Sequence, residues 1–400
     1  MRTVTPRGLL LLMVSARYFP DMGGIETHVH EVARRLVHMG VNVTILTTMP
    51  QHTLTPLPRE TVSEGIRIIR VNAWSHTSDL CIAPDVYSVI KKGNWDLVHC
   101  QGIHTLVPPL AMLAARRAHI PFVVTFHTGG HSSLLRNKVR STQWQILRPL
   151  LASAERLIGV SHFEADYFRD VLHLPPQLFT VIPNGATLPT VQRPLGETPD
   201  HTPDHTLIIS LGRLERYKGH QHMVTALPKI REQRPDARLL ILGAGSYASS
   251  LRKLAQKAGV AEHVEIRAIP AGDRQAMAET LLQASLVTLM SEYEAHPVAV
   301  MEALSLQRPV LGIHTAGQRE LAEQGMIRTI PLNSPPEVVA AAALEQIERP
   351  LIPQHLVLPT WEECAEKLLA VYESFSPKSQ PGRGQAISPT MDELARPSSV

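Results

Sequence analysis

Cysteine is scarce in this sequence. Its 400 residues include 3 cysteines, Cys81, Cys100 and Cys364, and no CxxC or CxxxxC spacing occurs among them. Zinc sites and disulfide frameworks depend on cysteines at close, regular spacings, so this pattern argues against both. It fits a protein of the reducing cytoplasm, where we expect the chain to act.

Long hydrophobic runs are also missing. The N-terminal stretch MRTVTPRGLLLLMVSARYFP places basic residues before an apolar run, as a signal peptide does. The run is far shorter than a membrane span, however, and no small-residue cleavage site follows it. We therefore expect neither a signal peptide nor a transmembrane helix, and interpret residues 9–15 as a buried parallel strand.

Metal-binding patterns are absent, and acidic residues are fewer than basic residues in the first half of the chain. No D-x-D motif occurs, and no histidines and carboxylates are spaced as metal ligands. We expect no metal, no cofactor and no nucleic-acid partner. Residues 1–190 contain 18 basic and 12 acidic side chains, whereas residues 191–400 contain 21 and 24. This imbalance reflects either chance or an anionic partner of the first half.

The length of the chain predicts two domains, each large enough for its own core. Short apolar strands alternate with amphipathic helices throughout, which is typical of parallel βαβ units covered on both faces. Strands of the first series are expected at residues 9–15, 41–48, 66–71, 96–100, 121–127, 156–161 and 180–184. Strands of the second series are expected at residues 206–212, 238–243, 264–268, 286–290 and 309–312.

The predicted boundaries follow composition. Residues 1–190 form the first Rossmann-like domain, and residues 191–205, rich in proline and threonine, form a linker. Residues 206–358 form the second domain, a helix follows at 360–375, and residues 376–400 are expected to be disordered.

The first helix is predicted within GGIETHVHEVARRLVHMG, where the residues on one helical face are apolar and Gly40 supplies a left-handed residue that ends the helix. That face contains Val29, Val32, Ala33, Leu36 and Val37.

The stretch LGRLERYKGH, residues 211–220, ends a predicted strand and begins a helix. Open α/β sheets place ligands at such turns, because backbone amides and the helix dipole converge there. Arg213 and Lys218 add two positive charges that suit a pyrophosphate. A solvated basic loop is the alternative interpretation.

The stretch SEYEAHPVAVMEALS, residues 291–305, brackets a helix N-terminus with two carboxylates. Pro297 suits the first helical turn, Glu294 lies on the preceding loop, and Glu302 lies about two turns into the helix. Carboxylates accept hydrogen bonds from sugar hydroxyls, and free amides favour phosphate, so this segment could hold a nucleotide sugar. Two surface acids on one helix are the alternative.

Two further turns could approach a ligand. Gly23 and Gly24 follow the first strand and open the first helix, whereas LILGAGS, residues 240–246, is not a full GxGxxG and does not indicate a dehydrogenase. Among 20 histidines, His127 ends a predicted strand before a flexible Thr-Gly-Gly, so we expect its ring at the carboxyl edge of the sheet.

A basic, apolar segment at residues 133–151 has the composition of a helix that lies in a headgroup layer. It contains Arg136, Lys138, Arg140 and Arg148 with no acid, together with an interfacial candidate, Trp144. The hypothesis is that this helix contacts an anionic membrane surface. The alternative is that its apolar residues pack on the sheet.

In combination, these motifs closely resemble the retaining, GT-B fold glycosyltransferases of family 4. The resemblance covers almost the whole chain, and the motifs that carry it are GGIETHVHEVARRL, FHTGG, GVSHFEADYF, VIPNGA, LGRLERYKGH, ILGAGS, EYEAHPVAVMEAL, RPVL and AGQREL. It implies two doubly wound Rossmann-like domains facing a central cleft, with the last helix crossing back onto the first domain. Closure of the domains would exclude water.

The resemblance also implies roles for individual residues. Arg213 and Lys218 would hold the donor diphosphate, Glu302 the ribose, and Glu294 would face the transferred sugar; His127 would lie near the reacting carbon. The remaining donor-binding residues would be Gly23, Gly24, Gly212, His296, Pro297 and Val298. Two positions depart from the usual pattern, since Gln307 replaces a helix-ending glycine and His296 stands where phenylalanine is frequent.

The expected reaction is transfer of a sugar from a nucleotide diphosphate sugar to a hydroxyl of a glycan, glycolipid or lipid-linked acceptor, with retention and without metal. Catalysis would stabilise the charge that develops on the leaving diphosphate. Two alternatives share the architecture: an epimerase acting on nucleotide-bound aminosugars, and a non-catalytic nucleotide-sugar-binding protein.

Overall fold

The computed structural model describes residues 8–21, 23–50, 57–74, 81–127, 134–186, 188, 206–270, 273–354 and 356–375. Side chains 134–141, the predicted linker at 191–205 and the predicted tail at 376–400 lie outside the described residues. Two compact units are present. Of the described residues, those up to 127, 138–184 and 361–375 form unit 1, and the others form unit 2.

Unit 1 is built on a sheet whose described strands follow the order β3-β4-β2-β1-β5-β6-β7-β8. Neighbouring strands pair in parallel, except that β3 pairs antiparallel with β4 at the edge. The strands are β1 (Leu10–Ser15), β2 (Asn42–Thr48), β3 (Glu60–Ser63), β4 (Ile66–Val71), β5 (Leu97–Gln101), β6 (Phe122–Thr125), β7 (Arg156–Gly159) and β8 (Phe179–Val181).

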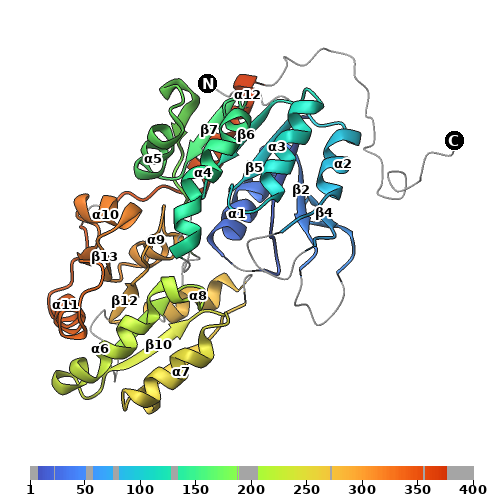
Figure 1. The fold of residues 1–400 in the computed structure, drawn as a ribbon. Helices are drawn as coiled ribbons and strands as arrows, with labels where there is room; N and C mark the ends of the chain where they lie inside the picture. Colours follow the sequence, from blue (N-terminus) through green and yellow to red (C-terminus); the bar gives the residue numbers. More distant parts are fainter. Residues whose placement is uncertain are drawn as a thin grey trace. The chain divides into compact units, whose positions relative to one another are not determined.

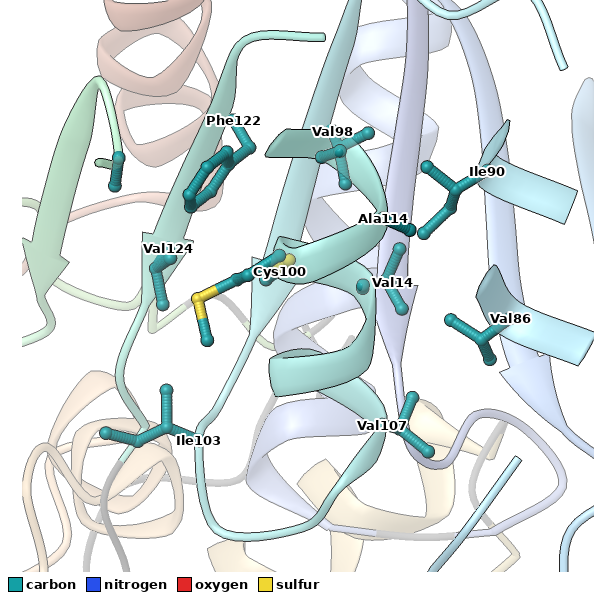
Figure 2. Packing of buried hydrophobic residues seen from close by; sticks show 14 of the residues in the cluster. Val14, Val86, Ile90, Val98, Cys100, Ile103, Val107, Ala114, Phe122 and Val124 are labelled. Carbon is teal, nitrogen blue, oxygen red and sulfur yellow. The ribbon is translucent and has the colours of Figure 1, made fainter. Parts of the chain in front are cut away.

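Helices cover both faces of this sheet, because each parallel pairing needs a crossover connection. They are α1 (Gly24–His38), α2 (Asp85–Lys92), α3 (Val107–Arg117), α4 (Leu134–Leu151), α5 (His162–Leu172), the 3-10 turn η1 (Pro176–Leu178) and α12 (Trp361–Phe375). Helices α2 and α3 lie side by side over one face (Figure 1). There Val98 and Cys100 of β5 lie in the same buried hydrophobic cluster as Ala114 and Val107 of α3 (Figure 2).

The opposite face of the sheet carries α1 and α12, which pack on each other. In α1, Val29, Val32, Ala33 and Leu36 are fully buried and Val37 is half-buried, so the predicted apolar face is confirmed. Gly40 has a φ of 89°, the left-handed conformation that closes a helix.

Unit 2 contains a second, all-parallel sheet in the order β11-β10-β9-β12-β13-β14. Its described strands are β9 (Leu207–Leu211), β10 (Arg238–Leu242), β11 (Val264–Arg267), β12 (Leu286–Leu289), β13 (Val310–Ile313) and β14 (Arg328–Ile330). One core lies against α6 (His220–Gln233), α7 (Ala248–Lys257) and α11 (Pro336–Glu348); the other lies against α8 (Arg274–Leu282), α9 (Val298–Ser305) and α10 (Ala316–Glu323). Short 3-10 turns occur at η2 (Arg216–Lys218) and η3 (Ala261–His263). The predicted α/β class with two parallel-sheet domains is confirmed.

The last helix belongs to unit 1 although the chain reaches it from unit 2. Its Trp361 is completely buried, and Glu362 accepts a hydrogen bond from Arg35 Nε of α1 at 2.7 Å. At its other end, the Tyr372 hydroxyl lies 2.7 Å from His99 Nδ1 of β5. Helix α12 is thus tied to the face of the sheet that α1 covers.

The interfacial role expected for Trp144 is wrong. Trp144 is buried in the core of unit 1, and its ring packs edge-on against Phe168 of α5 with centroids 5.5 Å apart. Leu147 is buried in the same core, and Arg148 donates to the Leu172 carbonyl at 2.7 Å. This half of α4 therefore packs on the sheet; Arg136, Lys138 and Arg140 belong to the undescribed side chains. Within the described residues, no helix has the length and apolar content needed to cross a membrane.

Helix α9 ends at a left-handed residue that carries a side chain. Gln307 has a φ of 55°, and its amide donates to the Leu304 carbonyl at 2.9 Å while Arg308 donates to Ala303. A Cβ in this conformation costs roughly 1–2 kcal/mol. The chain thus keeps the helix-ending geometry that glycine usually provides.

We expect Gln307→Gly to raise the free energy of unfolding by about 1 kcal/mol, because glycine adopts positive φ without this penalty. Denaturant unfolding of both proteins measures the difference. The matched control is Gln324→Gly at the end of α10, where φ is −79° and glycine should destabilise the protein. Loss of stability in both variants would show that Gln307 carries no conformational strain.

Candidate functional site

The turn after β9 in unit 2 is held in place by close backbone packing. Gly212 and Gly219 have φ values of 136° and 77°, and a Cβ on Gly219 would lie 1.9 Å from the Met290 carbonyl oxygen. A Cβ on Gly243 would lie equally close to the Gly212 carbonyl, and Leu214 donates to Ala244 at 2.9 Å. The glycines of LILGAGS therefore support this turn.

His220 also holds the turn in place through its two ring nitrogens. Its Nδ1 lies 2.8 Å from the Ser210 hydroxyl and its Nε2 lies 3.2 Å from the Arg213 carbonyl oxygen. Burial lowers the pKa of His220 to about 4, so the ring is neutral near pH 7. A neutral ring donates Nε2–H to the carbonyl and accepts from the serine. His220 was not predicted from the sequence, although it directly follows Gly219.

Lys218 and Glu294 are brought together across 76 residues of sequence. The ammonium lies 2.5 Å from Glu294 Oε1, and each side chain is 14% exposed. Burial alone would lower the pKa of Lys218, but the attraction of Glu294 and Tyr217 outweighs it and the pKa is raised. The lysine is therefore a fixed, charged donor beside a carboxylate.

Arg213 is more accessible than Lys218. Its Nη2 donates to the Tyr217 hydroxyl at 2.7 Å, and its Nη1 lies 2.8 Å from Glu215 Oε1. The side chain is 40% exposed. Tyr217 and Glu215, which the sequence did not single out, thus orient the guanidinium while leaving part of it open to solvent.

The carboxylates of residues 291–305 have different partners. Glu302 is buried in α9 and pairs with Arg274 Nη2 of α8 at 2.5 Å, a partner not predicted from the sequence. Glu294 is fixed through its backbone, since the Gly317 amide of α10 donates to its carbonyl at 2.8 Å.

The helix N-terminus between these acids differs slightly from expectation. Pro297 is the N-cap of α9, with extended ψ of 101°, so the first helical residue is Val298. Placing Pro297 in the first helical turn was therefore wrong by one position; its lack of an N–H is harmless at either place. His296 is half-buried immediately before it.

In unit 1, the glycine pair opens α1. Gly23 is the extended N-cap, with φ of 174°, and Gly24 is the first helical residue. A Cβ on Gly23 would lie 2.4 Å from Glu26 Oε2, whereas a Cβ on Gly24 would meet no heavy atom within 4 Å. The protein itself leaves open space beside Gly24, at the positive end of a 15-residue helix.

His127 lies just past the carboxyl end of β6, as predicted, but its ring is buried and does not project into solvent. It is 8% exposed and has a left-handed φ of 48°. Its Nε2 lies 2.8 Å from Gln101 Oε1, and its ring packs edge-on against His28 at 4.5 Å. Burial and the neighbouring histidines lower the pKa of His127 well below its ordinary value. Gln101 and His28 were not predicted as its partners.

The described residues contain no group of three or more histidine, cysteine or acidic side chains that could hold a metal ion. At the turn between β9 and α6, Arg213 and Lys218 supply positive charge that an anion could meet. The described geometry can thus bind a phosphate-bearing ligand in unit 2 and a neutral, hydrogen-bonding group near His127 in unit 1.

Comparison with known proteins agrees with this geometry. The family model for glycosyltransferase family 4 matches residues 22–188, and the model for glycosyl transferases group 1 matches residues 197–349. A D-inositol 3-phosphate glycosyltransferase of Nocardiopsis dassonvillei is 24% identical over 90% of this chain and 92% of its own. A phosphatidyl-myo-inositol mannosyltransferase of Mycobacterium tuberculosis is 25% identical over 91% and 96%.

Solved structures share the fold of most of this chain. The Anabaena protein HepE, solved in complex with UDP-glucose, has a TM-score of 0.64 at 16% identity and covers 91% of this chain and 97% of its own. Such a likeness shows the fold, and neighbours of this fold are GT-B glycosyltransferases. This chain is therefore a GT-B fold glycosyltransferase that belongs to family 4, with a group 1 second domain.

Proposed function

We propose that this glycosyltransferase moves a sugar from a nucleotide diphosphate sugar to an acceptor hydroxyl and retains the anomeric configuration. The observation that carries the proposal is the β9–α6 turn, where Lys218 is held beside Glu294 and Arg213 is presented by Tyr217 and Glu215. A diphosphate matches this pair of cations, because arginine binds two oxygens and lysine acts as a point charge.

In the proposed reaction, the cations act on the leaving group. Negative charge grows on the diphosphate as the bond to the sugar breaks, and preorganised donors there lower the barrier more than they strengthen ground-state binding. The amides at the start of α9, near Pro297 and Val298, would add to this effect. Gly212 and His296 would border the same donor.

The remaining roles follow from the position of each side chain. Glu302, oriented by Arg274, would accept from the ribose hydroxyls, and Glu294, oriented by Lys218, would face the transferred sugar. Gly23 and Gly24 would let the diphosphate approach the N-terminus of α1. His127 would lie against the sugar as a neutral ring.

The proposed acceptor is a hydroxyl on a phosphorylated polyol, either free or as a lipid headgroup. The two relatives are named for inositol phosphate and phosphatidylinositol substrates. An excess of basic over acidic side chains in residues 1–190, 18 against 12, supports an anionic acceptor for the first domain. The same proposal includes a cytoplasmic location and peripheral binding to the inner face of an anionic membrane. The three free cysteines support the cytoplasmic location, because free thiols fit a reducing compartment.

We expect one UDP-, GDP- or ADP-sugar of a panel to raise the Tm, because a ligand that binds the folded state stabilises it by mass action. Turnover with that donor should require the acceptor, inositol phosphate or phosphatidylinositol in vesicles, and should persist in EDTA. Release of the nucleoside diphosphate and the anomeric configuration of the product are the measurements.

Other outcomes would contradict the proposal, either in the function itself or in its metal independence and membrane contact. Conversion of the donor without acceptor would identify an epimerase, and binding without release of nucleoside diphosphate would identify a non-catalytic sensor. Loss of turnover in EDTA, restored by manganese or magnesium, would contradict metal independence. Turnover with the soluble acceptor and equal recovery on neutral and anionic vesicles would leave no membrane contact.

A further inference from the structure

A polar network crosses the face of the unit 1 sheet that α1 and α12 cover. Side chains of a strand alternate between the two faces. Since Val98 and Cys100 of β5 point into the core beneath α3 (Figure 2), His99 and Gln101 point to the other face. Thr125 of the neighbouring strand β6 reaches His99 there.

Gln101 joins the two histidines of this network. Its Oε1 lies 2.8 Å from His127 Nε2, and its Nε2 lies 3.2 Å from both ring nitrogens of His99. His99 is anchored in turn by the hydroxyls of Thr125 and Tyr372, at 2.8 and 2.7 Å. Gln101 and His99 are at most 1% exposed, so water does not compete for these bonds.

In the structure the Gln101 amide is oriented with Oε1 toward His127, and this orientation places the proton of the neutral His127 ring on Nε2. An amide oxygen only accepts, so the contact with Gln101 Oε1 requires a proton on Nε2 of His127. The ring is neutral, so Nδ1 then carries a lone pair, and it has no hydrogen-bond partner within the described residues. The same orientation of the Gln101 amide agrees with its second contact, because its Nε2 group then donates toward the neutral ring of His99.

His28 presents a second unpartnered nitrogen beside this ring. Its Nδ1 bonds Asn184 Oδ1 at 2.8 Å, which leaves Nε2 buried and without a hydrogen bond. The two rings meet edge to face at 4.5 Å. The titratable groups that shift the pKa of His127 are His28 from α1, His99 from β5 and His104 from the loop that follows β5; within the part of the chain that the structure describes, none of these groups is a carboxylate.

We propose that Gln101 is a positioning residue that holds His127 as the neutral Nε2–H tautomer, with the unprotonated Nδ1 available to accept a hydrogen bond from a hydroxyl group of a ligand. The inference rests on the proposed function, which places His127 against the transferred sugar. Departure of a leaving group from an anomeric carbon develops positive charge on the sugar. An imidazolium there would oppose that charge, whereas a neutral acceptor would not.

The direct test is the protonation state of His127 in 15N-histidine-labelled full-length protein. Long-range 1H–15N correlation spectra distinguish the two tautomers and the imidazolium, and a His127→Gln variant identifies the signal. Wild type should show the Nε2–H form throughout the range from pH 6 to 8. In Gln101→Met, which keeps the volume of the side chain but removes the amide, this signal should shift toward a mixture of tautomers.

Kinetics supply a second readout. Gln101→Met should lower turnover about tenfold, the effect of losing one orienting hydrogen bond. In Gln101→Glu, a carboxylate beside the ring stabilises the imidazolium, so the pKa of His127 should rise. Because the reaction needs the neutral ring, the acid limb of the pH–turnover profile should move to higher pH in this variant and stay in place in Gln101→Met.

Thr125→Val is the matched control, since it breaks one bond to His99 in the same buried network and leaves the contact of Gln101 with His127 intact. It should keep the wild-type His127 signal and pH profile. An Nδ1–H tautomer in wild type, an unchanged His127 signal in Gln101→Met, or an equal change in Thr125→Val would each overturn the proposal. If the signals behave as expected but His127→Gln keeps full turnover, the tautomer assignment stands and the proposed role of His127 fails.

Discussion

Lys218→Met should reduce turnover by about 10²–10³-fold, the range observed when one preorganised donor to a developing negative charge is removed. Methionine keeps the length and volume of the side chain. The Kd for the donor should rise by a smaller factor, because in the proposed reaction the charge on the diphosphate is greater in the transition state than in the bound donor. Single-turnover kinetics and a separate binding titration distinguish the two effects.

The ion pair with Glu294 complicates this variant and also provides its control. Removing Lys218 leaves Glu294, which is 14% exposed, without its partner, so Lys218→Met should also lose stability. Adding Glu294→Gln removes the uncompensated charge and should recover the stability but not the turnover. Recovery of turnover in the double variant would mean that Lys218 serves only to neutralise Glu294.

Arg213→Ala should show the same loss of turnover with little change in stability, since the guanidinium is 40% exposed and pairs with a half-buried glutamate, Glu215. Arg216→Ala is its control, because Arg216 lies on the same turn and is exposed. If Arg213→Ala and Arg216→Ala have equal, small effects, the turn is a solvated basic loop and the diphosphate binds elsewhere.

The sequence was sufficient to predict most strands of the two sheets, though not the edge strands β3 and β14, and the turn that carries Arg213 and Lys218. Both depend on local patterns: alternating strands and helices, and a glycine between a strand end and a helix start. The contact of Lys218 with Glu294 could not be predicted in the same way. It exists because β9 and β12 are neighbours in the sheet, and strand order is a property of the topology and not of either segment.

Prediction from the sequence failed most clearly where a segment of one composition is compatible with two different environments. A basic helix with apolar residues can lie on a membrane or pack on a sheet, and Trp144 does the second because Phe168 of α5 faces it. His127 was placed correctly at the sheet edge, but its burial depends on His28 and Gln101 from other elements. Such partners become visible only once the chain is folded.

Gly24→Ala should separate stability from donor binding at the N-terminus of α1. Alanine in this first helical position should raise the free energy of unfolding by about 0.5–1 kcal/mol, because it restricts the unfolded chain and its Cβ meets no further heavy atom of the described residues within 4 Å, beyond its chain neighbours and the helix backbone. The same methyl group would occupy the space through which the diphosphate is proposed to approach. The donor-dependent rise in Tm should therefore shrink, and turnover at a fixed donor concentration should fall at least tenfold, as expected when about 1.4 kcal/mol of binding is lost.

The control for Gly24→Ala is His38→Ala, at the exposed last residue of the same helix. It changes helix propensity in the same direction without approaching the N-terminus, so donor binding should match wild type. Two measurements, unfolding without ligand and Tm with the donor, decide the outcome. A Gly24→Ala protein that is stable and binds the donor normally would show that the diphosphate does not approach α1, and would confine donor binding to the turn of Arg213 and Lys218.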